Sequence, residues 1–177
     1  FTALVIDLGL SYHNKNKLQS AADAVTLAVS TMGADSLSYN PVKNYTENIN
    51  LCTEIQKYFE SNGIEDFKFD KNNTSASNIK VYSMRNKERA IQELSDNPDE
   101  SAALVFYNSD TETQYIEIYA HKKTTAIFGN IVDIGAYDLT VDSAAKCEVK
   151  FGGNPESLNY QILEIDGTEN FDITGPI

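Results

Sequence analysis

The chain has 177 residues, of which 41% are hydrophobic and 10% aromatic, and this is enough to build the core of one domain. Asp and Glu outnumber Lys and Arg by 26 to 14, so the formal net charge is −12. This balance excludes the basic surface that nucleic-acid binding requires, and it argues against docking on anionic lipid headgroups. The acidic residues are spread over many segments, as is typical of a solvated surface.

Residues 3–32 have an unbroken helical pattern with no proline and with Gly9 as the only glycine. Residues 1–10 are apolar on nearly every side of this helix. Further along, apolar side chains recur at three- and four-residue steps on one face, at Leu18, Ala21, Ala22, Val25, Ala28, Val29 and Met32. We therefore expect lipid or protein to surround the first part of the helix, and a domain to cover one face of the second.

The same helix carries a motif. An apolar segment ending in Val-x-Asp-x-Gly is followed by a polar stretch and then by Leu-Gln-x-Ala-Ala-Asp-Ala-x-x-Leu-Ala. This pattern resembles the N-terminal region of the TadE/TadG-like proteins, which belong to the tight-adherence (Flp) pilus machinery. The matching residues are Asp7, Gly9, Leu18, Gln19, Ala21, Ala22, Asp23, Ala24, Leu27 and Ala28. A weaker similarity lies at residues 128–145.

The resemblance implies a pilin-like fold and a non-enzymatic component of the cell surface, either a pilus assembly factor or a minor pilin-like subunit. Its partners would be other pilus or pilus-assembly subunits and, through the N-terminal helix, the membrane. The protein would be extracytoplasmic and anchored in the cell membrane or held at the cell surface. The motif residues would make contacts between helices or subunits. The Asp-x-Ser-x-Ser motif of the adhesive TadG-like proteins is absent, so their adhesive activity is not implied.

Ten apolar residues are too few for a membrane span, which needs about 20. Because the sequence starts with Phe1 rather than Met, we expect the natural protein to continue upstream, with residues 1–10 as the outer end of a transmembrane helix. A helix start that is buried inside a soluble protein is the alternative. We interpret Asp7 as the point where the helix leaves the membrane interface; pairing with a basic group of another subunit is the other possibility.

After the N-terminal helix (residues 1–32), we expect a head domain at residues 33–153 and a C-terminal β extension at residues 154–177. A second helix is predicted at residues 42–61, between Pro41 and the terminating Asn62-Gly63, and a short one at residues 85–94. The strands predicted from apolar alternation or from β-branched and aromatic residues are 64–70, 79–82, 102–107, 113–122, 137–151 and 158–163.

Strands 102–107 and 113–122 are expected to form a hairpin, and strand 137–151 is expected to pair with the second of them in antiparallel orientation. The predicted fold class is therefore α+β. It has a long N-terminal helix and a second helix packed on a mainly antiparallel sheet.

No phosphate loop, His-Glu metal motif, Gly-x-Ser-x-Gly sequence or Cys-His pairing is present, so we predict no cofactor, metal site or catalytic centre. The two histidines stand alone, His13 in a polar patch and His121 at an expected exposed edge of the sheet. Cys52 and Cys147 could form a disulfide in an extracytoplasmic domain, or each could be a small buried hydrophobe.

Two other function classes stay open. The protein could be a binding module that captures a peptide or glycan through its sheet, using Tyr107, Tyr115 and Tyr119 as an aromatic surface, although tyrosines in strands also serve ordinary packing. It could be an enzyme only if a deep pocket collected carboxylates with perturbed pKa values.

Overall fold

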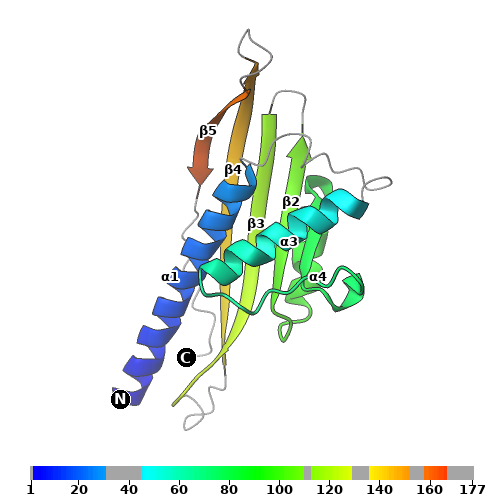
Figure 1. Cartoon of the computed structure of the whole chain (residues 1–177). Coiled ribbons are helices and arrows are strands. Elements are labelled where there is room, and N and C mark those ends of the chain that lie inside the picture. Colours follow the sequence, from blue (N-terminus) through cyan, green and yellow to red (C-terminus); the bar gives the residue numbers. More distant parts are fainter. Residues whose placement is uncertain (1, 31–44, 110–112, 129–135, 152–157, 167–177) are drawn as a thin grey trace.

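The computed structural model describes residues 2–30, 45–109, 113–128, 136–151 and 158–166, which form an α+β fold (Figure 1). The elements are the helices α1 (Thr2–Ser30), α3 (Tyr45–Ser61) and α4 (Lys87–Ser95), the strands β1 (Ile79–Ser83), β2 (Ala102–Ser109), β3 (Thr113–Thr125), β4 (Ala136–Phe151) and β5 (Leu158–Asp166), and two short 3-10 helices, η1 (Thr74–Ala76) and η2 (Met84–Asn86). The predicted fold class is confirmed.

The strands form one sheet in the order β1-β2-β3-β4-β5. β1 is parallel to β2, and every other neighbouring pair is antiparallel. The predicted β2–β3 hairpin and the antiparallel pairing of β3 with β4 are therefore confirmed. Within the expected C-terminal extension, residues 158–166 form β5, which pairs with β4 and extends the same sheet.

Helices cover both faces of this sheet. Side chains that alternate along a strand point to opposite faces, so one strand can contribute to the cores on both sides. Along β2, alternate residues from Ala103 to Tyr107 belong to the core shared with α1 and α3. The residues between them pack with Ala90 and Leu94 of α4. Figure 1 shows α1 running along β4 while α3 crosses the same side of the sheet.

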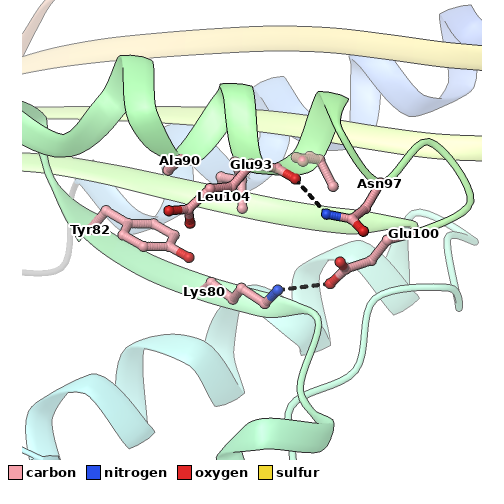
Figure 2. Close-up of a pocket in the computed structure, with 8 residues that line it drawn as sticks. Lys80, Tyr82, Ala90, Glu93, Asn97, Glu100 and Leu104 are labelled. Atoms are coloured by element: carbon pink, nitrogen blue, oxygen red, sulfur yellow. Dashed lines mark hydrogen bonds and ion pairs between the residues drawn. The ribbon is translucent and has the colours of Figure 1, made fainter.

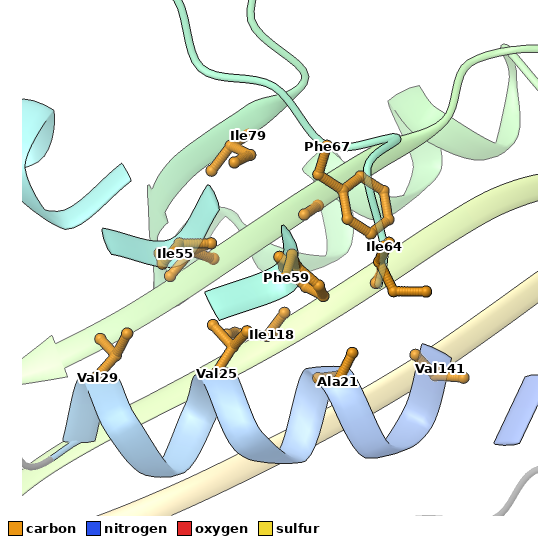
Figure 3. Packing of buried hydrophobic residues seen from close by; sticks show 14 of the residues in the cluster. Ala21, Val25, Val29, Ile55, Phe59, Ile64, Phe67, Ile79, Ile118 and Val141 are labelled. Atoms are coloured by element: carbon orange, nitrogen blue, oxygen red, sulfur yellow. The ribbon is translucent and has the colours of Figure 1, made fainter. Parts of the chain in front are cut away.

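The main core lies between α1, α3 and the sheet. The apolar stripe predicted in the second half of α1 is buried, and its members Leu18, Ala21, Ala22, Val25 and Val29 are each 0% exposed. Figure 3 shows Ala21, Val25 and Val29 pointing from α1 toward Phe59 and Ile118. The two alanines let the helix backbone approach the sheet closely, since they add little side-chain volume between the two elements.

Helix α3 ends at the predicted Asn62-Gly63 through a Schellman motif. The Gly63 N–H donates to the Glu60 carbonyl, the Ile64 N–H donates to the Phe59 carbonyl, and Gly63 has a φ of +74°. The Lys17 ammonium of α1 donates to the Gly63 carbonyl at 2.9 Å. A positive charge thus lies at the negative end of the α3 dipole and ties the two helices together.

Two glycine substitutions should change stability in opposite directions. Gly63→Ala is expected to lower the free energy of unfolding by about 1–2 kcal/mol, because a side chain disfavours the left-handed conformation. Gly9→Ala should raise it by up to about 1 kcal/mol, because Gly9 lies inside α1 with nothing within 4 Å of an added Cβ. Urea denaturation of both variants checks this, and shifts of the same sign would contradict it.

The strand predicted at residues 64–70 is wrong. This segment belongs to no sheet and has a bend at Asp66, and its backbone is bound mainly by side chains rather than by a neighbouring strand. Asn78 accepts from the Lys68 N–H and donates to the Asp66 carbonyl, and Gln56 accepts from the Phe69 N–H. The apolar side chains of the segment still point inward, and Phe67 packs edge-on against Phe59 with ring centroids 4.7 Å apart.

His121 was expected at an exposed edge, and the structure corrects this. The side chain is 8% exposed, and its Nδ1 lies 2.9 Å from the Glu100 carbonyl oxygen. β3 is an inner strand, and His121 lies opposite Ala102 of β2 and Thr140 of β4 rather than at an edge. The other predicted strands and the short helix are confirmed within a few residues. The expected helix end at Met32-Gly33 and the helix start at Pro41 lie outside the described residues.

Candidate functional site

Exposed apolar side chains gather at one end of the molecule. Among the described residues, eight large hydrophobic side chains are exposed, and seven of them lie at this end, at Val5, Ile6, Leu8, Leu10, Tyr12, Ile127 and Phe128. The first five come from the N-terminal part of α1 and the last two follow β3. We call these seven side chains the apolar end. In Figure 1 the ends of β3 and β4 extend beside the N-terminal part of α1.

The exposed side chains on α1 cover slightly more than half of the helix circumference. At 3.6 residues per turn, the positions from Val5 to Tyr12 span an arc of about 200°. Asp7 lies outside this arc, on the same face as the buried Leu18 and Val25. A helix that packs on one partner exposes a narrower apolar stripe than this. The N-terminal part of α1 therefore suits an apolar medium over slightly more than half of its circumference, on the side away from the face that bears Asp7.

Asp7 is the polar residue that fastens the apolar end to the sheet. Its carboxylate is buried, and its two oxygens accept from the backbone N–H groups of Ile127 at 3.0 Å and Phe128 at 2.9 Å. Hydrogen bonds to a charged acceptor are stronger than neutral ones, and here one side chain satisfies two loop donors. The structure thus gives Asp7 an intramolecular role as a clamp, which the sequence did not predict.

A small hollow of about 150 Å³ adjoins this clamp. Asp7, Leu10, Thr124 and Tyr137 are among the side chains that line it. Burial and, to a smaller extent, the charge of Asp7 raise the pKa of the Tyr137 hydroxyl. The tyrosine therefore stays neutral at physiological pH and adds no second negative charge beside Asp7.

The predicted motif helps to hold α1 on the sheet. Gln19 donates from Nε2 both to the Asp23 carboxylate and to the Asp142 carbonyl of β4, each at 2.9 Å. Asp142 lies two residues before Ala144, which is the first β4 residue that pairs with β5. The side chain of Gln19 thus reaches the β4 backbone where β5 no longer does, and Asp23 orients it.

The structure divides the motif residues by exposure. Leu18, Ala21 and Ala22 are fully buried against the sheet. Gln19, Asp23, Ala24 and Ala28 are half-buried, whereas Leu27 is exposed. The motif therefore makes the expected helix contacts through its buried members, and Leu27 lies outside the packed face.

The structure describes the side chain of only one of the two cysteines. Cys52 in α3 is a free cysteine and is 3% exposed. Burial raises the pKa of its thiol from 9.0 to about 12. Of the two interpretations left open, the structure has Cys52 as a small buried hydrophobe and not in a disulfide. The side chain of Cys147 lies outside the described residues.

Cys52 should stay unreactive in the folded protein. We expect iodoacetamide at pH 8 to leave Cys52 unmodified until denaturant is added. Because the folded-state pKa is raised, the neutral thiol favours folding below pH 9 and this stability is lost as the pH rises from 9 toward 12. Relative to Cys52→Ala, the wild type should therefore lose about 1 kcal/mol between pH 8 and pH 10. Peptide mapping and urea denaturation provide the readouts, and a Cys52–Cys147 disulfide peptide would contradict the free thiol.

The tyrosines proposed as an aromatic binding surface are not all accessible. Tyr107 is 5% exposed and belongs to the main core. Tyr115 and Tyr119 are half-buried on the strand next to it, and burial raises the pKa of Tyr119. The described structure thus assigns Tyr107 to packing, which removes it from the expected binding surface.

A second hollow of about 290 Å³ lies between β1 and α4 (Figure 2). An ion pair of 2.7 Å between Lys80 and Glu100 crosses it, and Asn97 donates to the Glu93 carbonyl at its rim. The described residues that line it include no histidine, cysteine or serine. The charges of Lys80 and Glu100 neutralise each other, and the described lining offers no histidine, cysteine or serine as a nucleophile.

The described residues contain no group of three or more His, Cys, Asp or Glu side chains that could hold a metal ion. Among the described helices, none combines the length and the apolar content that a membrane span requires. Comparison of the chain with known protein families, with curated proteins and with solved structures finds no significant match.

Proposed function

We propose that this chain is a non-enzymatic, membrane-anchored, extracytoplasmic component of a Tad/Flp-type pilus, acting as an assembly factor or a minor pilin-like subunit. The observation that carries the proposal is the change of environment along α1. Its residues from Leu18 to Val29 pack on the sheet by one face, whereas its residues from Val5 to Tyr12 expose apolar side chains over an arc of about 200°.

The size of the apolar end indicates how it would act. Transferring each of these half-exposed side chains out of water is worth about 1 kcal/mol, so the five on α1 contribute about 5 kcal/mol. This resembles a single short lipid chain, which binds membranes only weakly and reversibly. Stable anchoring through α1 therefore requires a longer apolar helix, and the proposal assigns residues 1–10 to its outer end.

Two further observations support the pilus assignment. The resemblance to TadE/TadG-like proteins is concentrated in α1, and its motif residues Leu18, Ala21 and Ala22 are among those that pack the helix on the sheet. A long N-terminal helix packed on a mainly antiparallel sheet also matches the pilin-like architecture that the resemblance implies. The partners proposed on this basis are other pilus or pilus-assembly subunits.

Fractionation of cells that express the natural gene product tests this proposal. The expected result is recovery in the membrane fraction, with the head digested when protease is added to intact spheroplasts. Deletion of the gene should also remove surface filaments, and the wild-type gene should restore them. A product that stays in the cytosolic fraction, or a deletion strain with unchanged filaments, would overturn the proposal.

A further inference from the structure

We propose that the segment Ala126–Phe128 is a second membrane contact, which enters the surface of a zwitterionic lipid bilayer beside α1 and fixes the orientation of the head. This inference rests on the proposed membrane anchoring of α1. It adds a separate element of the fold, the end of β3, to the surface that meets lipid.

The position of this segment is set by Asp7. Its two hydrogen bonds hold Ile127 and Phe128 at the level of the second turn of α1. Ile127 is 62% exposed and Phe128 is 36% exposed. Both backbone donors therefore bind the helix while both apolar side chains remain accessible, so entry of these side chains into lipid leaves neither donor unpaired.

The depth of the segment also fits. Tyr12 and His13 begin the polar part of α1, and tyrosine is enriched at the membrane–water interface. At 1.5 Å per residue, Asp7 lies about 7 Å along the helix axis from Tyr12 toward the N-terminus. If Tyr12 lies at the interface, the clamped Ile127 and Phe128 lie within the depth of about 5–10 Å that interfacial segments reach.

Lipid suits this surface better than a second copy of the chain. Residues 5–12 and 126–128 contain one charged group, the carboxylate of Asp7, which is 2% exposed. The apolar arc on α1 is too wide for a single packed helix, and the apolar loop widens the surface further. The net charge of −12 opposes binding to anionic headgroups, so the proposal commits to phosphatidylcholine.

The absence of tryptophan from the sequence makes the test direct. Single tryptophans are placed by Phe128→Trp, Val5→Trp and Leu27→Trp, and the chain is mixed with phosphatidylcholine vesicles that carry brominated acyl chains. Phe128→Trp and Val5→Trp should both shift to shorter emission wavelength and be quenched by bromine. Leu27→Trp is the matched control, because Leu27 is an exposed apolar residue of α1 outside the apolar end. Its emission should not change.

The outcomes separate the two proposals. Quenching at position 5 without quenching at position 128 would overturn this inference and leave the proposed anchoring by α1 intact. No quenching at either position would overturn both. A blue shift at position 128 without bromine quenching would indicate a protein contact, such as a second copy, and would also overturn the inference.

A pair of variants adds a quantitative readout. Ile127→Ser combined with Phe128→Ser should lower vesicle partitioning roughly tenfold, because two apolar side chains are lost from the inserted surface. Leu27→Ser should leave partitioning unchanged. Adding Asp7→Ala to the Phe128→Trp protein should reduce the quenching of Trp at position 128. Adding Asp7→Ala to the Val5→Trp protein should leave the quenching at position 5 unchanged. Equal partitioning of the double variant and the wild type would overturn the inference.

Discussion

Asp7→Ala is expected to lower the free energy of unfolding by about 2–3 kcal/mol, because it removes both charge-assisted hydrogen bonds to the Ile127 and Phe128 N–H groups. The same variant should speed hydrogen exchange at these two amides. Urea denaturation and amide exchange measure the two effects.

Two variants control for this change. Asp7→Asn keeps one acceptor oxygen for two donors, so its loss of stability should be intermediate. Asp70→Ala removes an exposed carboxylate that accepts from the Asn72 N–H, and it should cost less than about 1 kcal/mol. If Asp7→Ala cost no more than Asp70→Ala and left the exchange of both loop amides unchanged, the clamp would be refuted.

Phe59→Ala should produce the largest loss of stability, about 3–5 kcal/mol. Phe59 is 0% exposed, packs edge-on with Phe67, and lies where α1, α3 and the segment at residues 64–70 meet. Its removal leaves a cavity that the rigid helix and sheet cannot close. The midpoint and slope of urea denaturation give the measured change.

Phe128→Ala is the matched control, since it deletes the same ring from the apolar end, where the side chain is 36% exposed. It should change stability by less than about 1 kcal/mol in aqueous buffer. Similar losses for Phe59→Ala and Phe128→Ala would contradict the assignment of one ring to the core and the other to an exposed contact surface.

The sequence predicted the elements whose side chains repeat regularly. Leu18, Val25 and Val29 follow a helical period, and the β3 residues from Tyr115 to Tyr119 are dense in β-branched and aromatic types, so both elements appear where they were expected. These patterns report burial directly, because a helix or strand buries one face at a fixed spacing. The parallel pairing of β1 with β2 could not be predicted in this way, because side-chain periodicity does not specify which strands are neighbours.

The segment at residues 64–70 shows why one strand prediction was wrong. Alternating apolar residues indicate an extended backbone with one buried face, and Phe67 is indeed buried. The alternation does not specify what satisfies the backbone. Here Asn78 and Gln56 do so with their side chains, and neither residue is distinguishable from an ordinary surface amide in the sequence.

The role of Asp7 was missed although a signal existed. Asp7 precedes Leu18 by 11 residues and Val25 by 18, close to three and five helical turns, so it lies on the packed face of α1. The identity of its partner could not be predicted, because Ile127 and Phe128 lie about 120 residues away and contribute backbone groups. His121 was misplaced for a similar reason, since its partner is the backbone carbonyl of Glu100.

The central claim is that α1 is one helix in two environments, with residues up to about 10 in an apolar medium and residues from Leu18 onward packed on the head. Nitroxide labels at positions 5, 6, 8, 10, 20 and 27, in a Cys147→Ala background with phosphatidylcholine vesicles, test it through collision rates with dissolved oxygen. The account predicts that vesicles raise the oxygen collision rate at positions 5, 6, 8 and 10 and leave it unchanged at positions 20 and 27. Rates that vesicles leave unchanged at all six positions would contradict it.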